Sequence, residues 1–212
     1  QRAATTWTET AVLYPPDGAA FDMFGFSVTL ASDGTRAAVG AIRDATARGL
    51  DAGTAHVFRR EGMSWVHEAT LEPPATRTVR EFGVSLDLDD TGTRCVVGAT
   101  PDTGTLPGGA YVFVRTGTSW ALESELSPPL GPGVRFGSAA AISGDSSRAL
   151  VGSGADVPPG QTAHVFRREG SRWLHEDTLT TVAPRDVFGG SAALDRTGTL
   201  AVLARSHWTD GD

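Results

Sequence analysis

Four Phe-Gly pairs recur along this chain at intervals of 58, 54 and 52 residues, and four tryptophans recur with nearly the same period. The pairs are Phe24-Gly25, Phe82-Gly83, Phe136-Gly137 and Phe188-Gly189, and the tryptophans are Trp7, Trp65, Trp120 and Trp173. Two markers that keep one register over most of a chain indicate a single supersecondary unit used about four times. Because stacked repeats share a core with their neighbours, we expect one domain over residues 1–212. Its predicted units span approximately residues 8–65, 66–120, 121–173 and 174–212, with an N-terminal strand at 5–13.

Each unit contains four short apolar segments that are typical of β-strands. The first segment follows the Phe-Gly pair, as at 26–30, and ends at a turn rich in Asp, Gly, Ser and Thr, such as 32–35. The second ends in Val-Gly, and a tight turn then joins the third and fourth, as at 55–58 and 65–71. Such turns between short β-type runs are hairpin signals, so the segments are predicted to pair in order. No segment shows the apolar spacing of a helix.

The hairpin between the third and fourth segments allows a specific register to be predicted. With Glu61-Gly62 as a two-residue turn, Phe58 is expected to pair with Trp65, and Val57 with Val66. The tryptophan of each unit is interpreted as a core residue, because large aromatic side chains dominate burial. Four antiparallel strands in about 50 residues, apolar on both faces, are typical of a β-propeller blade. We therefore predict an all-β fold.

The Phe-Gly pairs, together with the Val-Gly-Ala steps at 39–41 and 97–99 and the segment 109–113, resemble FG-GAP repeats. This family builds the β-propeller of integrin α subunits and of many surface proteins. The resemblance implies a β-propeller of about four FG-GAP-type four-stranded blades, of which the last is incomplete. It also implies an extracellular or cell-surface location and an adhesion or recognition role.

The number of strands leaves three arrangements open. The N-terminal strand around Trp7 is positioned to supply the missing fourth strand of the last unit, which nearly closes a four-bladed ring. Alternatively, the chain is part of a larger propeller, or an open half-ring that a second chain completes. An open array leaves strand edges bare and favours self-association.

Composition excludes several partners and functions. The formal net charge is −7 and no run of basic residues occurs, which argues against nucleic acid and anionic membrane surfaces as partners. The chain contains no stretch of 18 apolar residues, so membrane insertion is not expected. Cys95 is the one cysteine, so no intrachain disulfide can form, and its apolar surroundings in sequence predict a buried small side chain.

Two groups of residues are candidates for metal binding. With the turn placed at Glu61-Gly62, His56 faces His67, and Glu169-Gly170 likewise sets His164 opposite His175. A zinc site needs three or four ligands, and Glu68 and Glu176 are expected on the opposite face because side chains alternate along a strand. A slipped turn would separate the histidines. The turn with Asp87, Asp89 and Asp90 is the other candidate, for calcium, which takes six to eight oxygens. We predict no metal site and no cofactor.

No catalytic motif is present, since the chain lacks a Gly-x-Ser-x-Gly elbow, a His-Glu-x-x-His pair and a phosphate-binding glycine loop. We therefore predict a non-enzymatic module that binds a protein or a glycan of unknown identity. Its binding residues are expected in the variable loops 43–52, 101–108 and 154–161. The alternative is a structural building block of a cell-surface or filamentous assembly that associates through blade edges. A propeller-scaffolded hydrolase or lyase is the third alternative.

Overall fold

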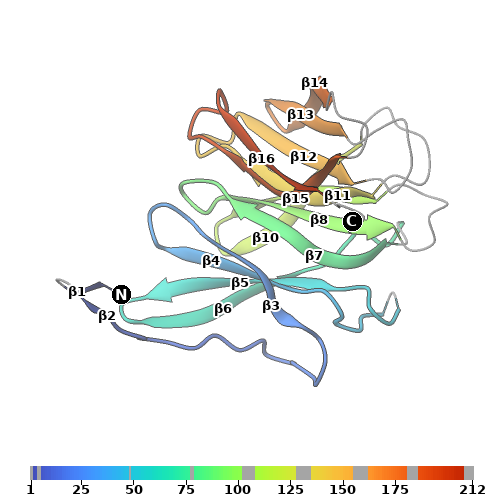
Figure 1. Cartoon of the computed structure of the whole chain (residues 1–212). Coiled ribbons are helices and arrows are strands. Elements are labelled where there is room, and N and C mark those ends of the chain that lie inside the picture. The colour runs from blue at the N-terminus through green and yellow to red at the C-terminus, as the bar shows by residue number, and fades with distance from the viewer. Residues whose placement is uncertain are drawn as a thin grey trace.

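The computed structural model describes residues 2–3, 6–47, 49–76, 79–101, 108–127, 135–154, 162–180 and 186–207. Every regular element among these residues is a β-strand, as predicted. Besides a short two-stranded sheet near the N-terminus, three four-stranded antiparallel sheets and a second two-stranded sheet follow one another along the chain and stack side by side (Figure 1). We call them blades 1 to 4, with blade 4 partial.

Within each blade the strands pair in chain order, which confirms the predicted hairpins. Blade 1 contains β3 (Phe24–Leu30), β4 (Arg36–Ala41), β5 (Thr54–Glu61) and β6 (Ser64–Leu71). Blade 2 contains β7 (Val79–Leu88), β8 (Arg94–Pro101), β9 (Gly109–Thr116) and β10 (Ser119–Leu126). Blade 3 contains β11 (Arg135–Ile142), β12 (Arg148–Gly154), β13 (Thr162–Glu169) and β14 (Arg172–Thr180). Blade 4 contains β15 (Asp186–Leu194) and β16 (Ala201–His207).

The cores lie between consecutive blades. The first strand of each blade packs on the first two strands of the blade before it, so β7 lies against β3 and β4, and β11 against β7 and β8. Leu86 and Leu88 of blade 2 share one buried cluster with Ala38 and Val57 of blade 1. We call the face that packs on the preceding blade the leading face, as with Leu86 and Leu88. The opposite face, as with Ala38 and Val57, is the trailing face.

The Phe-Gly pairs form the backbone contact between blades. Gly83 has a φ of +92°, in the left-handed region that favours glycine, and its carbonyl accepts a 2.5 Å hydrogen bond from Oγ of Ser27 in blade 1. A Cβ on Gly40, the glycine of the first Val-Gly step, would lie 2.2 Å from that same carbonyl. The two glycine motifs of the sequence therefore meet across the junction of neighbouring blades.

The junction between blades 2 and 3 has the same construction. Oγ of Ser85 donates to the carbonyl of Gly137 at 2.9 Å, and a Cβ on Gly98 would lie 2.0 Å from that oxygen. The turns between the first two strands also bond from blade to blade, with the backbone N–H of Asp33 donating to the carbonyl of Asp90 at 3.1 Å. The N–H of Asp90 donates in turn to the carbonyl of Gly144 at 3.0 Å.

Of the three arrangements left open by the sequence, a ring closed by the N-terminal strand is not formed by the described residues. Strand β2 (Thr6–Trp7) pairs with β1 (Arg2–Ala3) in a separate two-stranded sheet, and Trp7 is 79 % exposed. In a complete blade the fourth strand pairs with the third strand. The described part of blade 4 has two strands, β15 and β16, and therefore no third strand with which β2 could pair. No sheet of the described residues joins blade 4 to blade 1, so these blades form an open array.

The predicted register of the hairpin between β5 and β6 is wrong. The two-residue turn is Gly62-Met63, because Glu61 pairs with Ser64, and this shifts Trp65 opposite Arg60 and His67 opposite Phe58. Gly62 has a φ of +62°, the conformation that a tight hairpin turn requires at its first central position. A register shift between Val57 and Phe58 then offsets the rest of the pair by one residue.

Candidate functional site

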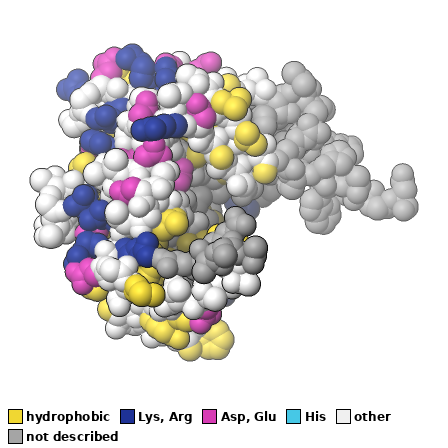
Figure 2. Space-filling model, turned by 90° about the vertical axis from the view of Figure 1, so that its left-hand side faces the viewer, with side chains coloured by type: hydrophobic (Ala, Val, Ile, Leu, Met, Phe, Trp, Pro, Cys, Tyr) yellow, Lys and Arg dark blue, Asp and Glu magenta, His cyan; other side chains and the backbone are white. Residues whose placement is uncertain are grey.

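The two rims of the array differ in kind. The short hairpin turns lie at one rim, and loop 43–52 lies at the other, which we call the long-loop rim (Figure 1). Figure 2 faces the short-turn rim, where arginine and carboxylate side chains intermingle and apolar side chains appear at the lower end, near blade 1. Loop 43–52 is described except for residue 48, whereas most of the predicted binding loops 101–108 and 154–161 lies outside the described residues.

Loop 43–52 is fixed at its base by two aspartates. The backbone N–H of Gly53 donates to the carbonyl of Asp44 at 3.0 Å, and Oγ1 of Thr54 donates to Oδ2 of Asp44 at 2.7 Å. Asp51 reaches the next blade, since its carboxylate pairs with Arg80 at 2.6 Å and its carbonyl accepts the N–H of Glu81 at 3.0 Å. The base therefore spans the junction of blades 1 and 2.

The tip of this loop is closed on itself and presented to solvent. The backbone groups of Thr46 and Gly49 exchange hydrogen bonds of 3.0 and 3.2 Å, which makes a small turn beyond the anchored base. Leu50 next to it is 83 % exposed. An apolar side chain held outward on an anchored turn is suited to binding, because little conformational freedom remains to be lost.

The His56 and His67 pair meets despite the shifted register. Nδ1 of His56 lies 3.4 Å from Nε2 of His67, and Oγ1 of Thr70 lies 3.3 and 3.2 Å from these two nitrogens. Nε2 of His56 lies 3.0 Å from Oγ1 of Thr54. Because Thr54 gives its hydroxyl proton to Asp44, Nε2 of His56 must be the protonated nitrogen and Nδ1 the acceptor. The expectation that a slipped turn separates the pair is therefore wrong.

The same four residue types occupy the same positions in blade 3. Nδ1 of His164 lies 3.2 Å from Nε2 of His175, and Oγ1 of Thr178 bridges them at 3.2 and 3.0 Å. Oγ1 of Thr162 lies 2.9 Å from Nε2 of His164. Burial, and secondarily the neighbouring His175, lowers the pKa of His164 to about 4. Burial, followed by the charge of His67, also lowers the pKa of His56.

Blade 2 replaces this polar set as a whole. Gly109, Tyr111, Leu122 and Glu125 stand where blades 1 and 3 have Thr, His, His and Thr. A Cβ on Gly109 would lie 2.4 Å from the hydroxyl oxygen of Tyr111, so tyrosine and threonine exclude one another at these neighbouring positions. The histidine network is therefore one of two alternative fillings of a buried position in this repeat.

Each imidazole pair supplies two nitrogens, and the described residues contain no group of three or more His, Cys, Asp or Glu side chains placed to hold a metal ion. Glu68 and Glu176 lie on the opposite face, as predicted, where they pair with Arg36 and Arg148 at 2.8 Å.

Asp87, Asp89 and Asp90, the candidate calcium ligands of blade 2, each form hydrogen bonds with different partners. Asp87 accepts from the backbone N–H of Ile142 and from Oγ1 of Thr29, and burial raises its pKa. Asp89 accepts from Thr93 and Ser146, and Asp90 from Ser32. These carboxylates link blade 2 to its neighbours and do not converge on one point.

Cys95 is fully buried in β8, as predicted, and burial raises the pKa of its thiol well above its ordinary value. The described residues also contain no helix that is long and apolar enough to cross a membrane.

Sequence reasoning missed one recurring contact, between the tryptophans and the glutamates. Nε1 of Trp120 donates to Oε2 of Glu68 at 3.0 Å, and Nε1 of Trp173 donates to Oε2 of Glu123 at 2.9 Å. Burial alone would raise the pKa of Glu68, but the hydrogen bonds from Arg36 and Trp120 bring it below its ordinary value. The shared period of Trp, Glu and Arg is the signal that could have revealed this contact.

Comparison with known proteins identifies the repeat and the fold. Residues 7–58 match the FG-GAP repeat family. The structure is similar to the periplasmic gluconolactonase PpgL of Pseudomonas aeruginosa, with 16% identity and a TM-score of 0.46, over 85% of this chain and 65% of that one. It is also similar to TolB from Acinetobacter baumannii, with 11% identity and a TM-score of 0.50, over 88% of this chain and 38% of that one.

TolB is a β-propeller, and at 11% identity the likeness to it shows the fold alone. The chain spans less than two thirds of the length of either protein. No protein of curated function matches it in sequence. The chain therefore folds as a β-propeller-type array, and it carries an FG-GAP repeat over residues 7–58.

Proposed function

We propose that this protein is a non-enzymatic recognition module of the cell exterior, which binds a protein or a glycan through the long-loop rim. The observation that carries the proposal is loop 43–52, whose base is anchored to two blades by Asp44 and Asp51 while its tip presents Leu50 to solvent. A rigid scaffold with an outward loop is a common arrangement for binding. The FG-GAP match supports the same role by analogy with surface proteins of that family.

The polar groups on the described part of the rim also favour binding over catalysis. Asp44 and Asp51 are occupied by Thr54 and Arg80, and His56 is fully buried behind Thr54. A nucleophile or general base needs an accessible reacting atom. The rim therefore offers apolar and backbone contacts to a partner.

The proposal is tested by probing glycan arrays and arrays of cell-surface proteins with the intact chain and with the variant Leu50→Asp. We expect binding to at least one array member, and we expect Leu50→Asp to weaken it about tenfold or more, since a charge replaces an apolar contact at the interface centre. The matched control is Met63→Asp, at an apolar side chain that is 71 % exposed on the opposite rim. Failure to bind any member, or equal losses for the two variants, would contradict the proposal.

A further inference from the structure

The junctions between blades 1 and 2 and between blades 2 and 3 share a set of complementary parts. The trailing face supplies a serine hydroxyl, a glycine without a side chain and an arginine, as with Ser27, Gly40 and Arg36 in blade 1. The leading face supplies a Phe-Gly carbonyl, from Gly83 in blade 2 and Gly137 in blade 3, and a turn residue, which is Gly92 in blade 2 and Ser146 in blade 3. A Cβ on Gly92 would lie 3.0 Å from Cβ of Arg36, so the turn packs directly on the arginine stem.

The leading face of blade 1 carries all of its parts, and they are uncovered. Gly25 has the same left-handed φ of +94°, and nothing lies within 4 Å of the position of a Cβ on it or on the turn residue Gly34. Val28 is 71 % exposed, whereas its counterparts in the next blades, Leu86 and Ala140, are buried. The leading face of blade 1 therefore has the same contact groups as the leading face of blade 2, which forms a junction inside the molecule.

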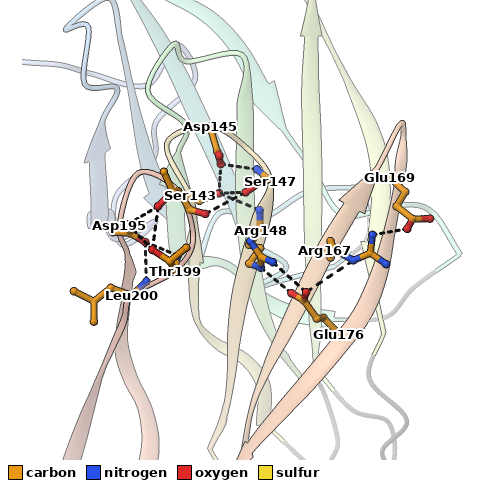
Figure 3. A network of polar contacts seen from close by, with 11 residues as sticks. Ser143, Asp145, Ser147, Arg148, Arg167, Glu169, Glu176, Asp195, Thr199 and Leu200 are labelled. Carbon is orange, nitrogen blue, oxygen red and sulfur yellow. Dashed lines mark hydrogen bonds and ion pairs between the residues drawn. The ribbon is translucent and has the colours of Figure 1, made fainter.

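The trailing face of blade 4 lacks two of its parts. Leu200 stands where the preceding blades have Arg36, Arg94 and Arg148. Figure 3 shows Arg148 and Leu200: the Arg148 side chain is directed at Glu176, and the backbone N–H of Leu200 donates to Asp195 at 2.8 Å. Ala204, which pairs with Ser191, stands where Gly98 pairs with Ser85 and Gly152 with Ala139. A Cβ on Gly40 or Gly98 would lie 2.2 or 2.0 Å from the Phe-Gly carbonyl of the next blade, so the Cβ of Ala204 would collide with such a carbonyl.

We propose that the leading face of blade 1 docks a further blade of this same repeat type, and that Ala204 and Leu200 prevent a second copy of this chain from supplying that blade. The partner blade must keep glycine, serine and arginine at the positions of Gly40, Ser27 and Arg36. Exclusion of the self-complementary contact protects an open array from growing into head-to-tail filaments.

The probe for this surface is the chain itself with a restored trailing face, the double variant Leu200→Arg, Ala204→Gly. Its mass is followed by light scattering and analytical ultracentrifugation over a concentration series. We expect the wild type to stay at the monomer mass of 22.1 kDa and the double variant to rise about twofold or more. Adding Val28→Asp to the double variant should return it to the monomer, because it places a charge on the docking face.

The variant Gly98→Ala provides a second and independent measurement. Its Cβ should push blade 3 away from blade 2 and lower the Tm by roughly 5 °C. The proposal is overturned by a double variant that stays monomeric, by a wild type whose self-association Val28→Asp abolishes, or by a Gly98→Ala variant with an unchanged Tm.

Discussion

The indole N–H of Trp120 donates a 3.0 Å hydrogen bond to Oε2 of Glu68, which lies 52 residues earlier in the chain and in the preceding blade. Arg36 holds the same carboxylate with two hydrogen bonds, of 2.8 and 3.0 Å. The Glu68 side chain is 4 % exposed and Glu123, under Trp173, is 5 % exposed, whereas Glu176 is 30 % exposed. The tryptophans of blades 2 and 3 therefore each bury an ion pair of the blade before them.

Replacing Trp120 by phenylalanine should lower the free energy of unfolding by about 1–3 kcal/mol, because a hydrogen bond to a buried charged group is lost while most of the apolar area is kept. The control is Trp65→Phe, at the corresponding position of blade 1, where no described residue accepts from the indole. Its expected loss is below about 1 kcal/mol. Urea unfolding measures both, and equal losses would show that the hydrogen bond to Glu68 contributes nothing.

The stability of the protein should fall as the pH decreases from about 6.5 to about 4. Burial lowers the pKa of His164 to about 4 in the folded state, against an ordinary value of 6.5, so the unfolded chain takes up the proton first. The stabilisation is complete above pH 6.5 and is lost as the pH approaches the folded pKa. A pKa unit corresponds to about 1.4 kcal/mol, so His164 contributes about 3 kcal/mol of this change.

The measurement is urea unfolding at several pH values, compared with a variant in which blade 3 receives the residues of blade 2. That variant carries Thr162→Gly, His164→Tyr, His175→Leu and Thr178→Glu. Its stability should change less steeply between pH 6.5 and 4.5, and a slope equal to that of the wild type would show that the buried histidine network has no role in acid sensitivity.

The Thr-His-His-Thr set of blades 1 and 3 and the Gly-Tyr-Leu-Glu set of blade 2 should be exchangeable as whole sets, but not one residue at a time. Gly109→Thr alone should cost about 1–3 kcal/mol, because its Cβ would lie 2.4 Å from the hydroxyl oxygen of Tyr111. The full exchange Gly109→Thr, Tyr111→His, Leu122→His, Glu125→Thr should recover most of that loss at pH 8, where the new histidines are neutral. Thermal unfolding decides, and a full exchange no better than Gly109→Thr would refute coupling between these positions.

The thiol of Cys95 should not react while the protein is folded. The residue is fully buried and its pKa is raised by burial, so both access and thiolate formation are suppressed. A colourimetric thiol reagent should modify it at the rate of unfolding, and about a thousandfold more slowly than in urea. Rapid modification of the native chain would mean that the core between blades 1 and 2 opens locally.

The strands and their order in each blade could be predicted from the sequence, because they depend on local signals. The turn at Ser32 to Thr35 and the Phe-Gly pairs recur at fixed distances from apolar segments, and the structure follows them. The register of the hairpin between the third and fourth strands was predicted less accurately. Turn position depends on which residue takes the left-handed conformation, and Gly62 serves as the first turn residue where it was expected to be the second.

The contacts between blades were missed for a different reason. Glu68 and Trp120, or Gly40 and Gly83, belong to different units, and pairing within one unit gives no information on which of its residues meet the next. The role of the tryptophans was predicted in part, since Trp120 and Trp173 pack in cores whereas Trp7 is exposed. The fourth-strand pattern around Trp7 led to a wrong pairing, because a strand signal does not identify the edge that receives the strand.

The most direct test of stacked blades is amide hydrogen exchange, resolved by residue with NMR, at Asp33, Asp90 and Asp145. These backbone N–H groups sit in hairpin turns and donate to the carbonyls of Asp90, Gly144 and Arg196 in the following blades. If the blades are docked as described, the three amides exchange at least a hundredfold more slowly than those of the exposed turn at Gly117 and Thr118. Exchange as fast as in that turn would contradict the stacked arrangement.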